Sequence, residues 1–208
     1  MYTLPHMATV TAQERILQIA RKRGLIKAKD VEALGLHTQT LTRLVRKGQL
    51  ERIARGLYRL PDYDLTAHHG LVLASIAAPG GVICLLSALQ FHRIGTQLPH
   101  EVWIALDRRA RKPAIDYPPL RIVRFSGKAL TAGIEEHTLE GHTVRVYNVA
   151  KTLADCFKYR NKIGLDVALE ALNEAWRDRR FTMDEIERYA RICRVSKVMR
   201  PYLEAIVA

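Results

Sequence analysis

Apolar positions in the first part of the chain repeat with the spacing of a short helix. Thr11 is followed three residues later by Glu14, a pairing typical of the capping box at a helix start. From Ile16 to Ala20 the apolar side chains form a stripe along one face, and Gly24 follows three consecutive basic residues. The pattern therefore predicts a first helix that begins after Thr11 and ends at Gly24.

Two more short helices are expected directly after the first. The second covers Ala28–Leu34 and is closed by Gly35, and Thr38 stands where it would cap a third helix from Gln39 to Lys47. Two short helices joined by a brief turn that contains glycine are typical of a helix-turn-helix. An α-helix fits the major groove of DNA, where Arg and Gln side chains contact base edges. The expected DNA-binding residues of this third helix are Thr38, Gln39, Thr40, Arg43, Arg46 and Lys47.

A β-hairpin is predicted immediately behind the third helix. Two β-like runs, Leu50–Ile53 and Leu57–Leu60, flank a turn that contains Gly56. A hairpin in this place would form a wing, and arginines on it are suited to phosphates or to a minor groove. The three arginines of the expected wing are Arg52, Arg55 and Arg59. We therefore expect a winged helix-turn-helix DNA-binding domain over residues 10–62, with Gln39, Thr40 and Arg43 reading bases and the other cations holding phosphates.

The rest of the chain predicts a mixed α/β domain over residues 63–208. After a linker at Pro61–Asp64 we expect a helix over Leu65–Ala77, a Pro-Gly-Gly turn, and a β-like run at Val82–Leu86. Ser87 is placed to cap a short helix over Ala88–Arg93. Four more strands are expected to form a small, mostly antiparallel sheet: Glu101–Leu106, Leu120–Phe125, Ile134–Leu139 and Thr143–Tyr147.

A helical cap is expected to complete the second domain. Asn148 can cap a helix that runs to Tyr159, and three amphipathic stretches follow it. These are Leu165–Arg177, Met183–Cys193 and Val198–Val207. The fold class predicted for the chain is therefore α+β: residues 1–9 form a flexible tail, a winged helix-turn-helix follows, and a mixed C-terminal domain carries a small sheet and a helical cap.

Net charge favours a polyanionic partner. The chain has 208 residues and a formal net charge of +12, from 33 Lys+Arg against 21 Asp+Glu. Residues 1–65 carry +6 of this excess on under half of the length, and a dense local positive charge is what phosphate neutralisation requires. A second basic run comprises Arg108, Arg109, Arg111 and Lys112. It is either a solvated loop or an additional DNA contact, and both readings stay open.

Other classes of protein are disfavoured. Three widely separated cysteines without a CxxC pair indicate free thiols in a reducing, cytoplasmic compartment, and the N-terminus lacks the features of a signal peptide. The uncharged stretch from Gly70 to Phe91 is broken at Pro79, which disfavours a membrane span. Gly80 and Gly81 lack the lysine of a phosphate loop. We therefore expect no membrane segment, no cofactor and no catalytic site.

Metal-dependent catalysis is a weaker alternative. His68, His69 and His92 have no carboxylate or cysteine at matching positions, so packing or surface roles are expected. A nuclease would need Lys151 and three scattered aspartates to converge on a metal. These are Asp107, Asp116 and Asp155. Lys151 and Asp155, four residues apart, have the simpler explanation of a surface pair.

Several strings along the chain resemble the AbiEi family of type IV antitoxins. They are RIARGLYRL, VICLLSALQFHRIG, EVWIALDRRARKP, PLRIVRFS and the VAKTLADC segment, and the similarity spans residues 10 to 205. In that last segment Lys151 stands where the family usually has an arginine, so a role that needs a bidentate guanidinium is not expected at this position.

The resemblance implies a transcriptional autorepressor that binds inverted repeats of double-stranded DNA in its own promoter. It also implies an antitoxin that counteracts a nucleotidyltransferase-like toxin encoded in the same operon, without a stable complex. A C-terminal domain that instead masks the toxin by direct binding is the alternative.

Overall fold

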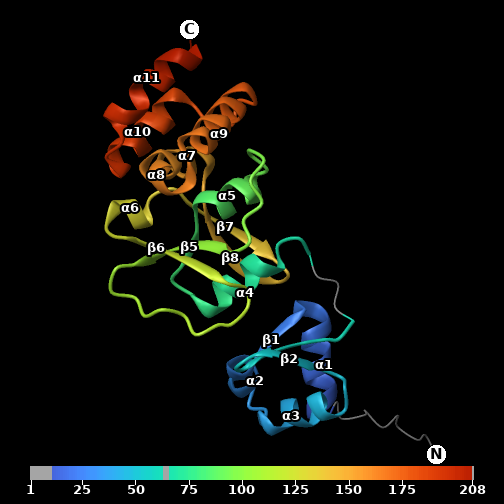
Figure 1. The fold of residues 1–208 in the computed structure, drawn as a ribbon. Coiled ribbons are helices and arrows are strands. Elements are labelled where there is room, and N and C mark those ends of the chain that lie inside the picture. The colour runs from blue at the N-terminus through green and yellow to red at the C-terminus, as the bar shows by residue number, and fades with distance from the viewer. Residues whose placement is uncertain (1–10, 63–65, 208) are drawn as a thin grey trace, which may run out of the picture. The chain divides into compact units, whose positions relative to one another are not determined.

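A computed structural model describes residues 11–62 and 66–207 and is drawn in Figure 1. The tail expected at residues 1–9, and the residues 63–65 of the expected linker and helix start, lie outside this description. The described residues form a mixed α+β structure with eleven helices and two sheets. They divide into two compact units. The N-terminal unit runs up to Thr66 and also includes Glu140–His142, and the C-terminal unit holds the rest.

The first helix of the N-terminal unit is α1 (Ala12–Arg23). The predicted capping box is confirmed: the Thr11 hydroxyl accepts a hydrogen bond from the backbone N–H of Glu14, and the Glu14 carboxylate accepts one from the backbone N–H of Thr11. Gly24 ends the helix with φ of +72°, a value that favours glycine. Local sequence signals therefore determine both ends of α1.

A three-stranded sheet and two short helices complete the N-terminal unit. The predicted hairpin is present as β2 (Glu51–Ala54) and β3 (Leu57–Arg59). The helices are α2 (Ala28–Ala33) and α3 (Gln39–Arg46), close to the predicted bounds. The sequence did not predict β1 (Leu25–Lys27), which pairs antiparallel with β3 and gives the strand order β1-β3-β2. Three residues are too few to show a β periodicity, so only the pairing with β3 reveals this strand.

The C-terminal unit combines a five-stranded sheet with helices. Its strands are β4 (Val82–Ile83), β5 (Val102–Asp107), β6 (Leu120–Phe125), β7 (Ile134–Leu139) and β8 (His142–Tyr147). Its helices are α4 (His69–Ala77), α5 (Leu85–His92), α6 (Lys128–Thr131), α7 (Val149–Lys158), α8 (Arg160–Ile163), α9 (Leu165–Arg177), α10 (Met183–Cys193) and α11 (Ser196–Val207). The predicted bounds of β6, β7, α9 and α10 are confirmed.

The expectation of a mostly antiparallel sheet is wrong. The strand order is β6-β5-β4-β8-β7, and β5 pairs parallel with β6 from Val102 opposite Leu120 to Asp107 opposite Phe125. β4 is also parallel to β8, and it is antiparallel to β5. A parallel pair needs a long crossover, and the chain between Asp107 and Leu120 supplies one. The sheet is therefore mixed.

The start of α5 also differs from the prediction. Ser87 does not cap this helix, because the N-cap position is Cys84 and Ser87 lies within the helix. The Ser87 side chain is buried, and its hydroxyl accepts a hydrogen bond of 2.9 Å from the backbone N–H of Trp103 on β5. A serine near a helix start can bond elsewhere when tertiary packing offers a partner, and here the bond joins α5 to the sheet.

Each unit has its own apolar core. The smaller core joins all three helices and the sheet of the N-terminal unit, with Ile16, Leu41 and Leu44 fully buried. The larger core lies between the five-stranded sheet and the helices α5, α7, α9, α10 and α11 (Figure 1). In the described part of the chain, no helix is both long and apolar enough to span a bilayer.

Candidate nucleic-acid interface

Helix α3 turns an apolar face to the core and a basic face to solvent. Leu41 and Leu44 are completely buried in the small apolar core, which also contains Ile16 of α1. The opposite face exposes Gln39, Arg43, Arg46 and Lys47. This division follows the 3.6-residue period of the helix, and it presents three cations and an amide on one exposed surface.

Two threonines of the predicted site do not lie as expected. Thr40 was expected to face outward, and this is wrong: it is 9% exposed because it lies one helical turn before Leu44, on the same inward face. Thr38 precedes α3, but its side chain makes no capping hydrogen bond and its backbone is already helical (φ −62°, ψ −22°). Most of the Thr40 side chain therefore faces the core and not the solvent.

Lys47 at the end of α3 is linked to α1. Its Nζ donates a hydrogen bond of 3.0 Å to Oε1 of Gln13, which lies in the first turn of α1. The contact is exposed, so water and phosphate can compete for the ammonium group. It orients the lysine at the edge of the exposed α3 face without neutralising its charge.

The hairpin presents its arginines unequally. Arg52 and Arg55 are exposed. Arg59 is instead engaged by Glu51 on the neighbouring strand, with Nε and Nη2 at 2.9 and 2.8 Å from the same carboxylate oxygen. Glu51 pairs with Arg59 and Arg52 pairs with Tyr58 in the register, so Arg52 and Arg59 lie on opposite faces of the ribbon. The exposed cations of the hairpin are therefore Arg52 and Arg55.

These side chains define what we call the N-terminal basic surface: Gln39, Arg43, Arg46, Lys47, Arg52 and Arg55. None of the ion pairs among the described residues involves one of its five cations. Cations without a carboxylate partner keep their charge available for a polyanion. The surface can therefore hold phosphates, and Gln39 and Arg43 have the side-chain chemistry to contact bases.

The second basic run lies in the crossover between β5 and β6. Arg108, Arg109, Arg111 and Lys112 are all exposed. The loop that carries them is anchored by Arg124 of β6, whose Nη1 donates hydrogen bonds of 2.7 Å to the backbone carbonyls of Asp107 and Ala110. The loop is therefore a fixed part of the C-terminal unit.

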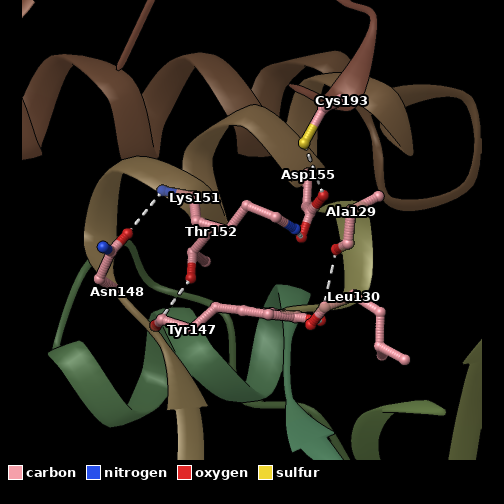
Figure 2. A network of polar contacts seen from close by, with 8 residues as sticks. All are labelled: Ala129, Leu130, Tyr147, Asn148, Lys151, Thr152, Asp155 and Cys193. Carbon is pink, nitrogen blue, oxygen red and sulfur yellow. Dashed lines mark hydrogen bonds and ion pairs between the residues drawn. The ribbon is translucent and has the colours of Figure 1, made fainter. Parts of the chain in front are cut away.

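Lys151 and Asp155 form a buried pair, which corrects the expectation of a surface pair. Both are 0% exposed within α7, and the Lys151 ammonium donates to the Asp155 carboxylate (Figure 2). The Sγ of Cys193 donates to the other carboxylate oxygen at 3.2 Å. The Lys151 Nζ also lies 4.0 Å from the centre of the Tyr147 ring. Burial raises the pKa of Asp155, and Lys151 opposes that rise.

Further hydrogen bonds hold the residues next to this fully buried pair. The Asn148 side chain accepts from the backbone N–H of Lys151 and so confirms the predicted cap of α7, while Tyr147 Oη donates to the carbonyl of Leu130 at 2.6 Å (Figure 2). The Thr152 hydroxyl donates to the Tyr147 carbonyl at 3.2 Å. Asp155 therefore has no access to a substrate or a metal ion, which removes a central member of the nuclease alternative.

A metal site would need ligating side chains that lie together, and a reactive thiol would need to be exposed; neither is found in the described part of the chain. No three His, Cys, Asp or Glu side chains there are grouped to hold a metal ion. Cys84, Cys156 and Cys193 are free and buried, and burial raises the pKa of each thiol. His92 is held by a contact of 2.7 Å between its Nε2 and the Tyr147 carbonyl.

Exposed cations on a short helix and on a neighbouring hairpin are typical of DNA-binding regulators. Residues 14–61, which contain the N-terminal basic surface, match the family described as "Transcriptional regulator, AbiEi antitoxin". The resemblance predicted from the sequence is therefore confirmed for residues 14–61. The match supports a DNA-binding regulator role.

Similarity at the level of the whole fold extends to a solved structure. The crystal structure of the RV2827C protein from Mycobacterium tuberculosis aligns with a TM-score of 0.58 at 17% sequence identity. The alignment covers 86% of this chain and 70% of that chain. At this identity the likeness concerns the fold alone. No curated protein matches the sequence.

Proposed function

We propose that residues 10–62 form a winged helix-turn-helix domain that binds double-stranded operator DNA. The observation that carries the proposal is the exposed face of α3, with Arg43, Arg46 and Lys47 opposite the buried Leu41 and Leu44. A helix of this kind enters a major groove while a neighbouring hairpin contacts the backbone. In this arrangement α3 is the recognition helix, and the ribbon of β2 and β3 is the wing.

The proposed contacts divide into base readout and phosphate binding. Gln39 and Arg43 read base edges, and Thr38 at the start of α3 contacts the adjoining backbone. The phosphate-binding cations are Arg46, Lys47, Arg52 and Arg55. Thr40 and Arg59, predicted from the sequence, are left out because Thr40 is buried and Arg59 is paired with Glu51.

The biological role that fits these contacts is autorepression within a type IV toxin–antitoxin system. The family description of the matched segment names both a regulator and an antitoxin. We propose that the protein binds inverted repeats in its own promoter in the cytoplasm, and that residues 63–208 form the antitoxin domain. The cognate toxin would be a nucleotidyltransferase-like protein from the same operon.

Base readout is tested with Arg43→Ala. Because a bidentate arginine–guanine contact contributes about 1–3 kcal/mol of discrimination, the variant should lose about 5- to 150-fold in operator affinity. The loss should shrink on an operator mutated at the contacted base pair. Gel-shift titrations on both fragments measure this. Unchanged affinity of Arg43→Ala for the operator contradicts the assignment of α3 as recognition helix.

Phosphate binding is tested with Lys47→Ala. Removal of one phosphate contact should weaken binding to every duplex alike, and it should lower the slope of log K against log salt by about one. Lys197→Ala is the matched control, because Lys197 is an exposed lysine of the C-terminal unit on α11. If Lys197→Ala changes the slope as much as Lys47→Ala does, the effect belongs to net charge and not to α3.

The antitoxin mechanism is tested by co-purification of separately tagged antitoxin and toxin. Counteraction without a stable complex predicts that the two separate on gel filtration while toxicity is still suppressed in cells. A complex that survives gel filtration favours direct masking of the toxin by the C-terminal domain.

A further inference from the structure

A second group of cations surrounds two aromatic rings in the C-terminal unit. Because β5 and β6 are parallel, their last residues, Asp107 and Phe125, end at the same edge of the sheet. The Phe125 ring lies there with its centre 5.9 Å from that of Tyr159, which directly follows α7. Phe125 is buried and Tyr159 is half-buried. The carboxyl edge of the sheet therefore carries an aromatic pair with one ring partly open to solvent.

Charged groups lie directly against these rings. Lys158 Nζ is 5.6 Å from the centre of the Phe125 ring, and Lys162 Nζ is 5.7 Å from that of Tyr159. Burial raises the pKa of Tyr159 to about 12, and the positive charge of Arg108 lowers it slightly. Arg108 is exposed in the loop that follows β5. We call the group Arg108, Lys158, Tyr159 and Lys162 the C-terminal basic face.

The positive charge of this unit is concentrated in the three sequence segments that carry or adjoin that face. Three segments, Asp107–Lys112, Arg124–Lys128 and Lys158–Lys162, hold nine Lys+Arg and one acidic residue, Asp107. The rest of residues 66–208 holds 12 Lys+Arg against 14 Asp+Glu. The Asp107 carboxylate is engaged locally, since it accepts a hydrogen bond of 2.8 Å from the backbone N–H of Arg109. Segregation of this kind costs self-repulsion, which a polyanion relieves.

The cations of these segments are also largely uncompensated within the protein. Among the described residues, no ion pair engages any of the nine. Arg124 and Arg160 are used structurally, the first on the carbonyls of Asp107 and Ala110 and the second on that of Phe157. Arg108, Lys158 and Lys162 are exposed, so they are available to an external anion.

We propose that the C-terminal basic face binds single-stranded nucleic acid. Cations beside a partly open aromatic ring are the combination that holds an unpaired strand, because the phosphates contact the cations and a base stacks on the ring. In a duplex the bases are already stacked and paired, so Tyr159 would have no base to accept. This site lies wholly within the C-terminal unit and does not depend on the duplex-binding role of α3.

The test is fluorescence anisotropy of the full-length chain with labelled RNA and DNA strands of about 12 nucleotides, within the site sizes usual for such surfaces. The double variant Lys158→Gln/Lys162→Gln should bind at least about tenfold more weakly at low salt. Loss of two phosphate contacts should also reduce the slope of log K against log salt by about 1.4. Lys197→Gln is the matched control and should bind like the parent protein.

The aromatic contribution is tested separately. Tyr159→Leu should weaken strand binding by about tenfold, because one stacked base is lost, and it should leave the salt slope unchanged. Tyr159→Phe keeps the ring and should bind like the parent. The midpoint of urea unfolding, measured for each variant, shows whether the C-terminal unit is still folded, and the comparison with Tyr159→Phe isolates stacking from packing.

Arg43→Ala separates this proposal from duplex binding. It should lose operator affinity and keep single-strand affinity, while Lys158→Gln/Lys162→Gln should do the reverse. Binding of either the RNA or the DNA strand supports the proposal and identifies the strand that the face accepts. Parent-like strand binding by the double lysine variant overturns it. The proposal is also overturned if Arg43→Ala and Lys158→Gln/Lys162→Gln each lose operator and single-strand affinity equally, because both ligands would then bind one common site.

Discussion

At the scale of single residues, Lys151 and Asp155 show how burial changes the meaning of a sequence spacing. A lysine and an aspartate four positions apart on an exposed helix face contribute only a few tenths of a kcal/mol. Inside the core, the same two charges have lost their water and depend on each other, on the Cys193 thiol and on the Tyr147 ring. The pair therefore links α7 to α10, through Cys193, and to β8, through Tyr147.

Asp155→Ala tests the contribution of this buried ion pair to stability. It leaves the Lys151 ammonium in the core without its carboxylate, so the free energy of unfolding should fall by about 3–5 kcal/mol. Because the cost comes from an uncompensated charge, adding Lys151→Met should recover a large part of the loss. Urea unfolding followed by circular dichroism measures both variants. If the free energy of unfolding of Asp155→Ala lies within about 0.5 kcal/mol of that of the parent protein, the ion pair does not stabilise the fold as proposed.

At the scale of elements, the turn between α6 and β7 depends on one glycine. Gly133 has φ of +76°, and its carbonyl accepts a hydrogen bond of 2.7 Å from the backbone N–H of Asn148, the cap of α7. A Cβ at Gly133 would lie 2.7 Å from the Cβ of Lys151. The close approach of this turn to α7 therefore requires a residue without a side chain.

Gly133→Ala should destabilise the C-terminal unit. The left-handed backbone alone costs about 1–2 kcal/mol for a residue with a Cβ, and the contact with α7 adds to this. Gly80→Ala is the matched control, because a Cβ at Gly80 meets nothing within 4 Å. Thermal unfolding should show a lower midpoint for Gly133→Ala and a nearly unchanged one for Gly80→Ala. Equal midpoints for the two variants would mean that the turn tolerates a side chain.

At the scale of the whole molecule, we expect net charge to determine the association rate with DNA and the strength of non-specific binding. The net charge of +12 divides equally between residues 1–65 and residues 66–208, at +6 each, and each unit carries one basic surface. A net positive charge raises the association rate with polyanions and supports non-specific binding. The two surfaces differ in chemistry: the N-terminal one presents an amide and arginines on a helix, and the C-terminal one presents lysines around an aromatic ring.

Salt should therefore weaken duplex binding steeply. The four phosphate-binding cations of the N-terminal basic surface predict a slope of log K against log salt of about −3.6. Affinity for any duplex should then fall by about two orders of magnitude between 0.05 and 0.2 M salt. Anisotropy titrations on a non-operator duplex measure this. A slope shallower than about −2 would mean that most of these cations make no phosphate contact.

Features that depend on neighbours in the chain were determined by the sequence itself. The capping box at Thr11, the Asn148 cap, and the bounds of α9, α10, β6 and β7 all follow from residues within a few positions of one another. The basic outer face of α3 is likewise a consequence of helical periodicity, as is the inward position of Thr40, one turn before Leu44.

Features that depend on distant partners were decided by the tertiary structure. β1 exists because β3 pairs with it, Arg59 is neutralised because Glu51 lies opposite, and Ser87 bonds Trp103 of another element. The parallel pairing of β5 with β6 and the burial of Lys151 with Asp155 have the same origin. A short spacing in sequence specifies dihedral angles and faces, whereas burial and strand partners arise only when segments far apart in the chain meet and exclude water.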